Sequence, residues 1–493
     1  MWLADSIGFS PQHSVYLSDV VRQLKKNCYR QRKQEGKCEW CDCLQQQVML
    51  RSSRQEKTKM KYFIFLLCGG FVTVTLTQQQ QVQFHSERRG ELPQNVSSDS
   101  HNAEVTPSPS DQEASIPDLQ TIHMLTEKNS EFGFNLYRKI ANLYEDNVFF
   151  SPNTVSTIFA MLSLGAKGPT CDNILQGLNI DDLGNISDKY QLHSLFHWLH
   201  RNITSNKGFF ISQGNALFIQ NDLELKQTLI NDLSNYYNAD INRVNFQDTV
   251  KTKNIINQYI RNKTNGKINQ LLDTVDSGAK LMLTNYILFK GQWEAPFDPN
   301  LTEIGTFYVN AYTRVKVPMM YKEGSFLSTY DENYSCTVLK LPYKESASML
   351  VVIPADTGYQ LLEDDLSVGL VAQWIKAMRF KHIDLYFPRF KLDKSYKMEK
   401  KLKQLGIIMP FTNAADLSGI SSSHRLKISE VIHKAVINVN ERGTEAAAST
   451  GTFAVPYSLP PLIKVDHPFL FMIHEDITKT LLFIGRVNDP TKL

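Results

Sequence analysis

Three segments of the chain place apolar residues at the spacing of an α-helix. In "MLTEKNSEFGFNLYRKIANLY" (124–144), apolar residues recur every three to four positions, and we predict a break at Asn129–Ser130. "VSTIFAMLSLGA" (155–166) is apolar on nearly all sides, which predicts a helix buried within the protein. "SYKMEKKLKQLGI" (395–407) predicts a helix that ends at Gly406.

Other segments have the pattern of β-strands. "KLMLTNYILFKGQW" (280–293) is a β-type apolar run, and "HIDLYFPRFKL" (382–392) alternates as one strand should. "CTVLKLPY" and "SMLVVIP" (336–343 and 348–354) predict a hairpin, and residues 467–490 predict two strands about a turn. Early helices and later strands without repeated βαβ units indicate an α+β fold, and no internal repeat is found.

The folded part of the chain is preceded by three segments of different composition. The run "MKYFIFLLCGGFVTVTLTQ" from Met60 has a lysine followed by apolar and small residues. It is shorter than the ~20 residues of a membrane anchor, so we predict a signal peptide at 60–77 and secretion. Residues 1–59 then form an upstream extension to which we assign no function. Residues 78–117 are polar and predict a flexible tail, and 118–493 form the globular domain.

The charge balance argues against a general nucleic-acid binder. The formal net charge is +3, and from Gln78 onward the chain holds 41 basic and 44 acidic residues. Only Cys171 and Cys336 follow residue 77, so no disulfide framework is expected, and the sequence leaves open whether the two pair. The upstream cysteines between Cys28 and Cys43 resemble a metal knuckle only weakly, and we predict no metal site.

Six Asn-x-Ser/Thr triplets suit a glycosylated extracellular surface. They begin at Asn95, Asn185, Asn202, Asn262, Asn300 and Asn333.

No short motif of a known enzyme site occurs in the chain. The G-x-S-x-G, H-E-x-x-H and Gly-rich phosphate-binding patterns are absent. Glu430 and His433 could form a base and its orienting partner, but a core histidine with satisfied hydrogen bonds is the favoured interpretation. The run "KMEKKLKQ" (397–404) reads as a solvated helix face rather than a polyanion site. We therefore expect a protein that is not an enzyme and holds no cofactor of its own.

The stretch "GTEAAASTGTFAVPYS" (443–458) has an unusual alternation. If residues 444–455 were extended, one face would carry only small side chains, while the other would carry Glu445 and Phe453. A permanent surface loop does not need an all-small face. A segment that sometimes inserts into a sheet does, because protein cores are close-packed and reject bulk. The residues of the small face are Thr444, Ala446, Ala448, Thr450, Thr452 and Ala454.

This stretch and several other motifs resemble the serpin family. They are "NVFFSP" (147–152), "YILFKGQWEAPFD" (286–298), "VKVPMMY" (315–321), "ISEVIHKAVINVNERGTEA" (428–446) and "HPFLFMI" with "LLFIGRVNDP" (467–490). They occur in the expected order and cover about three quarters of the chain. The resemblance implies three β-sheets, about nine helices and an exposed reactive-centre loop. It also implies a suicide inhibitor of serine proteases, whose cut loop inserts as a new strand.

The family spacing implies a hinge and a reactive bond. The cut residue lies sixteen positions after Glu441, which gives the bond Tyr457–Ser458. An aromatic residue there suits chymotrypsin-like specificity pockets. It is a poor fit to a protease pocket that requires a basic residue. Gly443 allows backbone freedom, and the alanines insert at little cost in side-chain entropy. The hinge residues are Glu441, Gly443, Thr444, Glu445, Ala446, Ala447 and Ala448.

The resemblance also implies a set of residues that control opening of the central sheet. Trp293 matches the tryptophan where the loop first enters the sheet. Thr154 stands where serine is usual, which leaves the packing of its extra methyl group in question. The shutter residues are Ser151, Thr154, Asn285 and His433.

The loop sequence "FAVPYSLPPLIKVDHPF" (453–469) is similar to that of an antitrypsin-like plasma inhibitor of coagulation. This implies factor Xa and factor XIa as target proteases, and protein Z, phospholipid and calcium as accessory factors. A local alignment places the protein Z surface on Tyr312 and Asp364; the alternative is a solvated tyrosine and a helix-start carboxylate. The basic residues around Lys376–Lys381 leave heparin binding undecided.

A second function remains open at this point, because some plasma serpins are non-inhibitory hormone carriers on the same fold. The small-residue hinge favours the inhibitor. In both cases we expect an extracellular plasma monomer without nucleic-acid partners.

Overall fold

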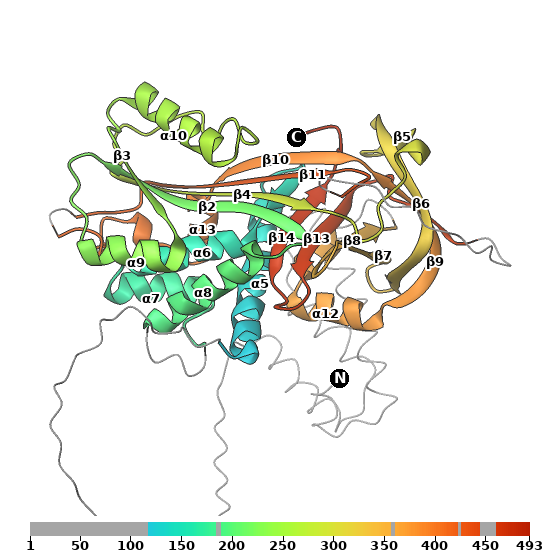
Figure 1. The fold of residues 1–493 in the computed structure, drawn as a ribbon, viewed down its shortest axis with the longest axis horizontal. Helices are drawn as coiled ribbons and strands as arrows, with labels where there is room; N and C mark the ends of the chain where they lie inside the picture. The colour runs from blue at the N-terminus through green and yellow to red at the C-terminus, as the bar shows by residue number, and fades with distance from the viewer. Residues whose placement is uncertain (1–116, 184–188, 356–359, 423–424, 444–459) are drawn as a thin grey trace, which may run out of the picture. The chain divides into compact units, whose positions relative to one another are not determined.

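The computed structural model describes residues 117–183, 189–355, 360–422, 425–443 and 460–493, all within one compact unit, Pro109–Leu493 (Figure 1). The upstream extension (1–59), the signal peptide (60–77) and all but the last residue of the predicted tail (78–117) lie outside the described residues. No helix in the described part is long and apolar enough to cross a membrane.

The described residues form helices α5 to α13 and two short 3-10 helices. The α-helices are α5 (Leu119–Ala141), α6 (Pro152–Ser163), α7 (Gly168–Gly177), α8 (Lys189–Thr204), α9 (Gln227–Tyr237), α10 (Thr249–Lys263), α11 (Gln360–Asp365), α12 (Val368–Ala377) and α13 (Glu399–Gln404). The 3-10 helices are η1 (Pro299–Leu301) and η2 (Met409–Phe411).

Helix α5 runs without the predicted break at Asn129–Ser130. The Ser130 hydroxyl donates to the carbonyl of Thr126 (2.7 Å), and Asn129 Oδ1 accepts from the Ser156 hydroxyl of α6 (2.6 Å). The Ser130 hydroxyl thus bonds back to the preceding turn of the same helix, and Asn129 bonds through its side-chain oxygen to α6, so both residues are accommodated without a break. Helix α6 is buried along its whole length, as its pattern predicts.

Fourteen strands are found in the described part. They are β1 (Val148–Phe150), β2 (Phe209–Gln220), β3 (Asp240–Val244), β4 (Leu281–Gly291), β5 (Glu303–Tyr308), β6 (Arg314–Asp331), β7 (Cys336–Pro342), β8 (Ala347–Pro354), β9 (Arg379–Pro388), β10 (Phe390–Lys397), β11 (Glu430–Val439), β12 (Leu462–Lys464), β13 (Phe469–Glu475) and β14 (Leu481–Val487).

Hydrogen bonds join these strands into two networks. One is a five-stranded sheet in the order β10-β11-β4-β2-β3. The other has nine strands, β1-β14-β13-β8-β7-β6-β9-β12, with β5 added to β6. The 18-residue strand β6 pairs with β5 at its start, with β9 in its middle and with β7 at its end. The three sheets that were expected are therefore present, with two of them continuous through β6.

The hairpins β7–β8 and β13–β14 agree with the sequence pattern, but the alternating run 382–392 is not one strand. Strand β9 pairs with β6 and β12 in the nine-stranded network, whereas β10 pairs with β11 in the other sheet. The chain changes sheet at Arg389, between Pro388 and Phe390. Alternation alone cannot distinguish one long strand from two that join different sheets.

The predicted helix 395–407 is also shorter than expected. Residues 395–397 belong to β10, and α13 covers only Glu399–Gln404 before Gly406, which has φ +93°. Its lysine face is not wholly solvated, because Lys401 is buried and its ammonium lies over the rings of Tyr144 and Tyr396 at 5.4 and 5.7 Å. A cation over aromatic faces can be buried more easily than an isolated one.

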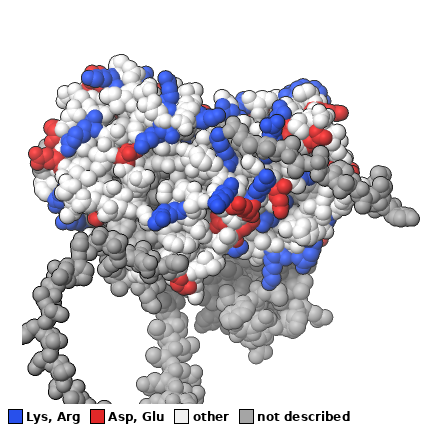
Figure 2. All heavy atoms as spheres, viewed as in Figure 1, with Lys and Arg blue, Asp and Glu red and all other residues white. Residues whose placement is uncertain are grey.

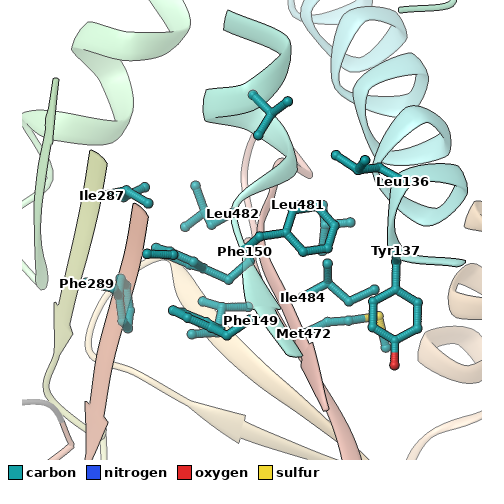
Figure 3. Packing of buried hydrophobic residues seen from close by; sticks show 14 of the residues in the cluster. Leu136, Tyr137, Phe149, Phe150, Ile287, Phe289, Met472, Leu481, Leu482 and Ile484 are labelled. Atoms are coloured by element: carbon teal, nitrogen blue, oxygen red, sulfur yellow. The ribbon is translucent and has the colours of Figure 1, made fainter. Parts of the chain in front are cut away.

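The main core lies where α5 and α6 pack on the nine-stranded network and on the five-stranded sheet (Figure 3). Leu136 of α5, Phe149 of β1 and Ile484 of β14 converge there with Phe289 of β4. A smaller cluster lies under α10, which covers the outer face of the five-stranded sheet, while α6, α8 and α9 lie toward its other face (Figure 1). Helices thus cover parts of both faces of the sheet, and opening it there requires these contacts to shift.

No disulfide joins Cys171 and Cys336, the two cysteines that follow residue 77, in the described structure. Burial raises the pKa of the Cys336 thiol to about 12. Four of the six glycosylation triplets lie in the described part, and the asparagine of each is exposed; Asn95 and Asn185 lie outside it.

Candidate functional site

The five-stranded sheet contains a parallel pair at its centre. Strand β11 pairs in parallel with β4 over eight positions, from Glu430 opposite Met282 to Ile437 opposite Phe289. The outer neighbours of this pair, β10 and β2, are antiparallel to β11 and β4 respectively. A strand placed between β11 and β4 in the opposite direction would be antiparallel to both. The pair therefore has the topology of a sheet from which one central strand is missing.

The chain reverses direction immediately after β11. Asn440 N donates to Gly443 O (2.9 Å), and Gly443 N donates to Asn440 O (3.1 Å), which closes a tight turn. Gly443 then forms an antiparallel bridge with Gln292, just beyond β4. The first rung of an antiparallel strand beside the end of β4 is thus already in place.

Gly443 cannot be replaced without strain in this turn. Its φ is +109°, a conformation that L-residues rarely adopt. A Cβ atom would lie 2.2 Å from the carbonyl oxygen of Gly291 and 2.6 Å from Trp293 N, both of them backbone atoms. The sequence argument for conformational freedom at this position therefore has a concrete form: only glycine fits against the end of β4.

Glu441 holds the turn to two other parts of the molecule. Its carboxylate is buried and accepts hydrogen bonds from Arg389 Nε (2.8 Å) and from the Thr302 hydroxyl (2.6 Å). A second guanidinium nitrogen of Arg389 lies 2.6 Å from Oε1. Burial acts to raise the pKa of Glu441, but the bonds from Arg389 and Thr302 outweigh it and lower the pKa. We call Glu441, Arg389 and Thr302 the hinge clamp.

Trp293 and the segment after it form the platform on which the turn rests. The indole donates to Asn440 O (3.0 Å), and Trp293 N donates to Arg442 O (3.2 Å). The indole stacks on the ring of Tyr343 with centroids 4.3 Å apart. Phe297 N donates to Glu441 O (2.8 Å). The turn is therefore fixed by its backbone as well as by the clamp.

The predicted shutter residues meet beneath the parallel pair. Ser151 N donates to Nε2 of His433 (3.1 Å), so this nitrogen carries no hydrogen. Nδ1 of His433 then donates to Oδ1 of Asn285 (2.9 Å), whose amide donates in turn to Oδ1 of Asn215 (2.7 Å). Burial lowers the pKa of His433 to about 3, so the ring is neutral at physiological pH. The network links β11, β4, β2 and the start of α6 through one histidine.

Thr154 is accommodated at the start of α6 despite its extra methyl group. It is buried, its backbone N–H donates to the Ser151 hydroxyl (3.4 Å), and its own hydroxyl donates to Ser151 O (3.3 Å). Glu430, by contrast, pairs with Lys397 rather than with His433. His433 is thus the satisfied core histidine that was favoured, and no base with its orienting partner is formed.

Thr444, Glu445, the three alanines Ala446, Ala447 and Ala448, and the bond Tyr457–Ser458 lie outside the described residues. Their flanks are described: Gly443 ends the turn beside β4, and β12 begins at Leu462 and pairs with β9. The loop therefore connects the five-stranded sheet to an edge of the nine-stranded network.

Tyr312 and Asp364 are both exposed. Tyr312 has 97% of its surface exposed at the turn between β5 and β6, where Asn310 Oδ1 accepts from Tyr312 N and from Thr313 N (2.9 Å each). Asp364 lies on the short helix α11. In the view of Figure 2, Lys and Arg are interspersed with Asp and Glu, without a large area of one sign.

Sequence reasoning missed Arg389, Thr302, Tyr343 and Asn215. Their roles depend on contacts between distant segments, and three of the four lie in ordinary strand or loop patterns. Arg389 alone carried a signal, because it interrupts an alternating run between two aromatic segments.

Comparison with known proteins identifies the class to which this fold and hinge belong. The profile of the serpin family (serine protease inhibitor) matches residues 127–490, and the chain belongs to this family.

Among its relatives are the protein Z-dependent protease inhibitors. The mouse protein is 42% identical over 377 residues, which cover 76% of this chain and 84% of the relative. The human protein is 43% identical over 371 residues, 75% of this chain and 83% of the relative. The crystal structure of the mouse inhibitor matches with a TM-score of 0.71 and covers 76% of this chain and 98% of that one. Human thyroxine-binding globulin, crystallised with its ligand, matches with a TM-score of 0.70 at 32% identity, over 75% of this chain and 99% of that one.

Proposed function

We propose that this chain is an extracellular inhibitor that traps serine proteases by inserting its cleaved loop between β11 and β4. The observation that carries the proposal is the combination of a parallel central pair with a turn that already directs Gly443 antiparallel beside the end of β4. From Thr444 to Tyr457 there are fourteen residues, enough to run the length of the 11-residue strand β4.

The energetic drive for insertion follows from the strand directions. Insertion replaces one parallel pairing with two antiparallel pairings, which are slightly more stable per residue. It also adds backbone hydrogen bonds along both edges of the new strand. The small-side-chain face of 444–454 lets the strand enter a sheet whose faces are partly covered by helices. Before cleavage the loop is held at both ends, so this free energy is not released.

We propose Tyr457–Ser458 as the bond that the protease attacks. The similarity to protein Z-dependent protease inhibitors supports factor Xa and factor XIa as targets, and protein Z as a partner, with phospholipid and calcium as accessory factors. Tyr312 is suited to a role in binding protein Z, because the Asn310 side chain orders the turn that presents it. We propose further that Asp364 forms part of the surface that binds protein Z, and that heparin is another accessory factor.

A carrier function is the weaker alternative. The chain is 32% identical to the thyroxine-binding structure and 42% identical to the mouse inhibitor. Its hinge also keeps the run of small residues that insertion requires, which a carrier does not need.

Incubation with factor Xa or chymotrypsin, followed by a denaturing gel, tests the proposal. An inhibitor gives a covalent adduct that survives SDS, and mass spectrometry should find the released fragment beginning at Ser458. If every protease tested gives only cleaved chain and no adduct, the trapping function is wrong.

A further inference from the structure

One glycosylation triplet overlaps the hinge clamp. Asn300, Leu301 and Thr302 form an Asn-x-Thr sequence, and the hydroxyl of the same Thr302 donates to Oε1 of Glu441 at 2.6 Å. Asn300 lies in η1 and is exposed. Asn300 is two residues before Thr302, so their Cα atoms lie at most roughly 7 Å apart. Whatever is attached to Asn300 therefore lies beside the hinge.

The local structure can accept a glycan without rearrangement. Asp298 Oδ1 accepts one bond from Asn300 N (2.9 Å) and one from the Asn300 side-chain amide (3.1 Å). The amide nitrogen has two hydrogens, and N-glycosylation replaces only one of them. The bond to Asp298 can therefore remain, which would fix the direction in which the first sugar leaves the surface. Leu301 and Ile304, exposed to 48% and 68%, offer apolar surface next to it.

We propose that Asn300 carries an N-linked glycan that guards the entrance of the sheet against the loop of a second molecule. In the modification, the Asn300 amide nitrogen attacks the first sugar carbon of a lipid pyrophosphate donor. A C–N bond forms, the C–O bond to the pyrophosphate breaks, and one amide proton is lost. The inference rests on the proposed inhibitor function, since it concerns the same gap between β11 and β4.

The two routes into this gap differ at the entrance. The molecule's own loop is already attached there, because Gly443 is bridged to Gln292 and needs no path past Asn300. A loop from another molecule has no such attachment and approaches the gap from solvent, and Thr302, in the same triplet as Asn300, lies against Glu441 at the start of that gap. A bulky, hydrated glycan at Asn300 would obstruct the second route and leave the first open.

The test compares variants of the full-length chain secreted from animal cells. Asn300→Gln removes the glycan and keeps the Thr302 hydroxyl. Asn202→Gln is the matched control, because it removes a triplet on helix α8 rather than beside the hinge. Thr302→Ser keeps both the triplet and the hydroxyl, whereas Thr302→Val removes both. Glycan occupancy is measured by mass spectrometry, polymers on native gels after warming, and protease adducts on SDS gels.

We expect Asn300 to be occupied and Asn300→Gln to polymerise several-fold faster than the parent protein, with its yield of adduct unchanged. Thr302→Val should polymerise faster still, and Asn202→Gln should match the parent. Enzymatic removal of glycans from the folded parent should reproduce the effect of Asn300→Gln, which covers the case in which that variant is poorly secreted. An unoccupied Asn300, or polymerisation of Asn300→Gln at the rate of the Asn202→Gln control, overturns the proposal. Loss of the adduct in the parent protein itself would instead refute the inhibitor function.

Discussion

The hinge clamp makes a quantitative prediction for Glu441→Gln. Glutamine has the same shape, but it loses the negative charge and keeps only one of the two acceptor oxygens that face Arg389 and Thr302. Hydrogen bonds to charged groups contribute about 1.5–3 kcal/mol. The Glu441 side chain is 4% exposed but that of Arg389 is 45% exposed, so solvent screens part of the pair. We therefore expect the turn to be destabilised by about 2 kcal/mol, or roughly 30-fold in the population of the open turn.

Hydrogen exchange measures this population directly. The amides of Trp293 and Phe297 donate to the carbonyls of Arg442 and Glu441, and they exchange only when the turn opens. Their exchange should accelerate roughly 30-fold in Glu441→Gln, while amides of β13 and β14 keep the parental rate.

Glu399→Gln is the matched control, since it neutralises a half-exposed carboxylate in the i,i+4 pair with Lys403 on α13. Such pairs contribute only about 0.3–0.5 kcal/mol. If Glu441→Gln changes the exchange of the Trp293 and Phe297 amides no more than this control does, the clamp does not hold the turn and the reasoning is wrong.

Three further changes probe other steps. Thr444→Arg should leave protease recognition intact but release cleaved chain instead of adduct, because a long cation cannot enter the sheet; trapping at the parental stoichiometry contradicts insertion. Tyr457→Arg should shift inhibition rates toward trypsin-like proteases, and no shift would mean that the cut lies elsewhere. Below pH ~6.5 the unfolded chain binds a proton at His433, whereas the folded chain, in which this pKa is about 3, does not. The free energy of unfolding therefore decreases as the pH is lowered. His433→Gln should therefore show a shallower loss of melting temperature between neutral pH and pH ~4; a slope equal to the parent's would refute this assignment.

The elements that are decided by local pattern could be predicted from the sequence. The buried helix α6, strand β4 and the two later hairpins follow from local apolar patterns, because α6, β4, β8 and β14 are buried along nearly their whole length. The exit of the chain from one sheet into the other at Arg389 was missed, because strands of both sheets alternate in the same way and only the interruption at Arg389 itself marks the change. The continuity of α5 through Asn129 involves a hydrogen bond from Ser156 of α6, a partner that only the folded molecule supplies.

The candidate site, like the fold, has some features that the sequence predicts and others that only the structure reveals. The need for glycine at position 443 could be inferred from the sequence, although its cause, the backbone of Gly291 and Trp293, could not. The shutter residues came from the family resemblance, and the structure brings all four together. The partners of Glu441 lie 52 and 139 residues away along the chain, beyond the reach of any local pattern.

Thermal unfolding of the intact chain and of the chain cut after Tyr457 is the measurement that addresses the central claim most directly. If the segment from Thr444 enters between β11 and β4, the cut molecule gains a central strand and should unfold at a clearly higher temperature than the intact one. A cut molecule that melts at the same temperature as the intact protein, or below it, would show that no strand has been added.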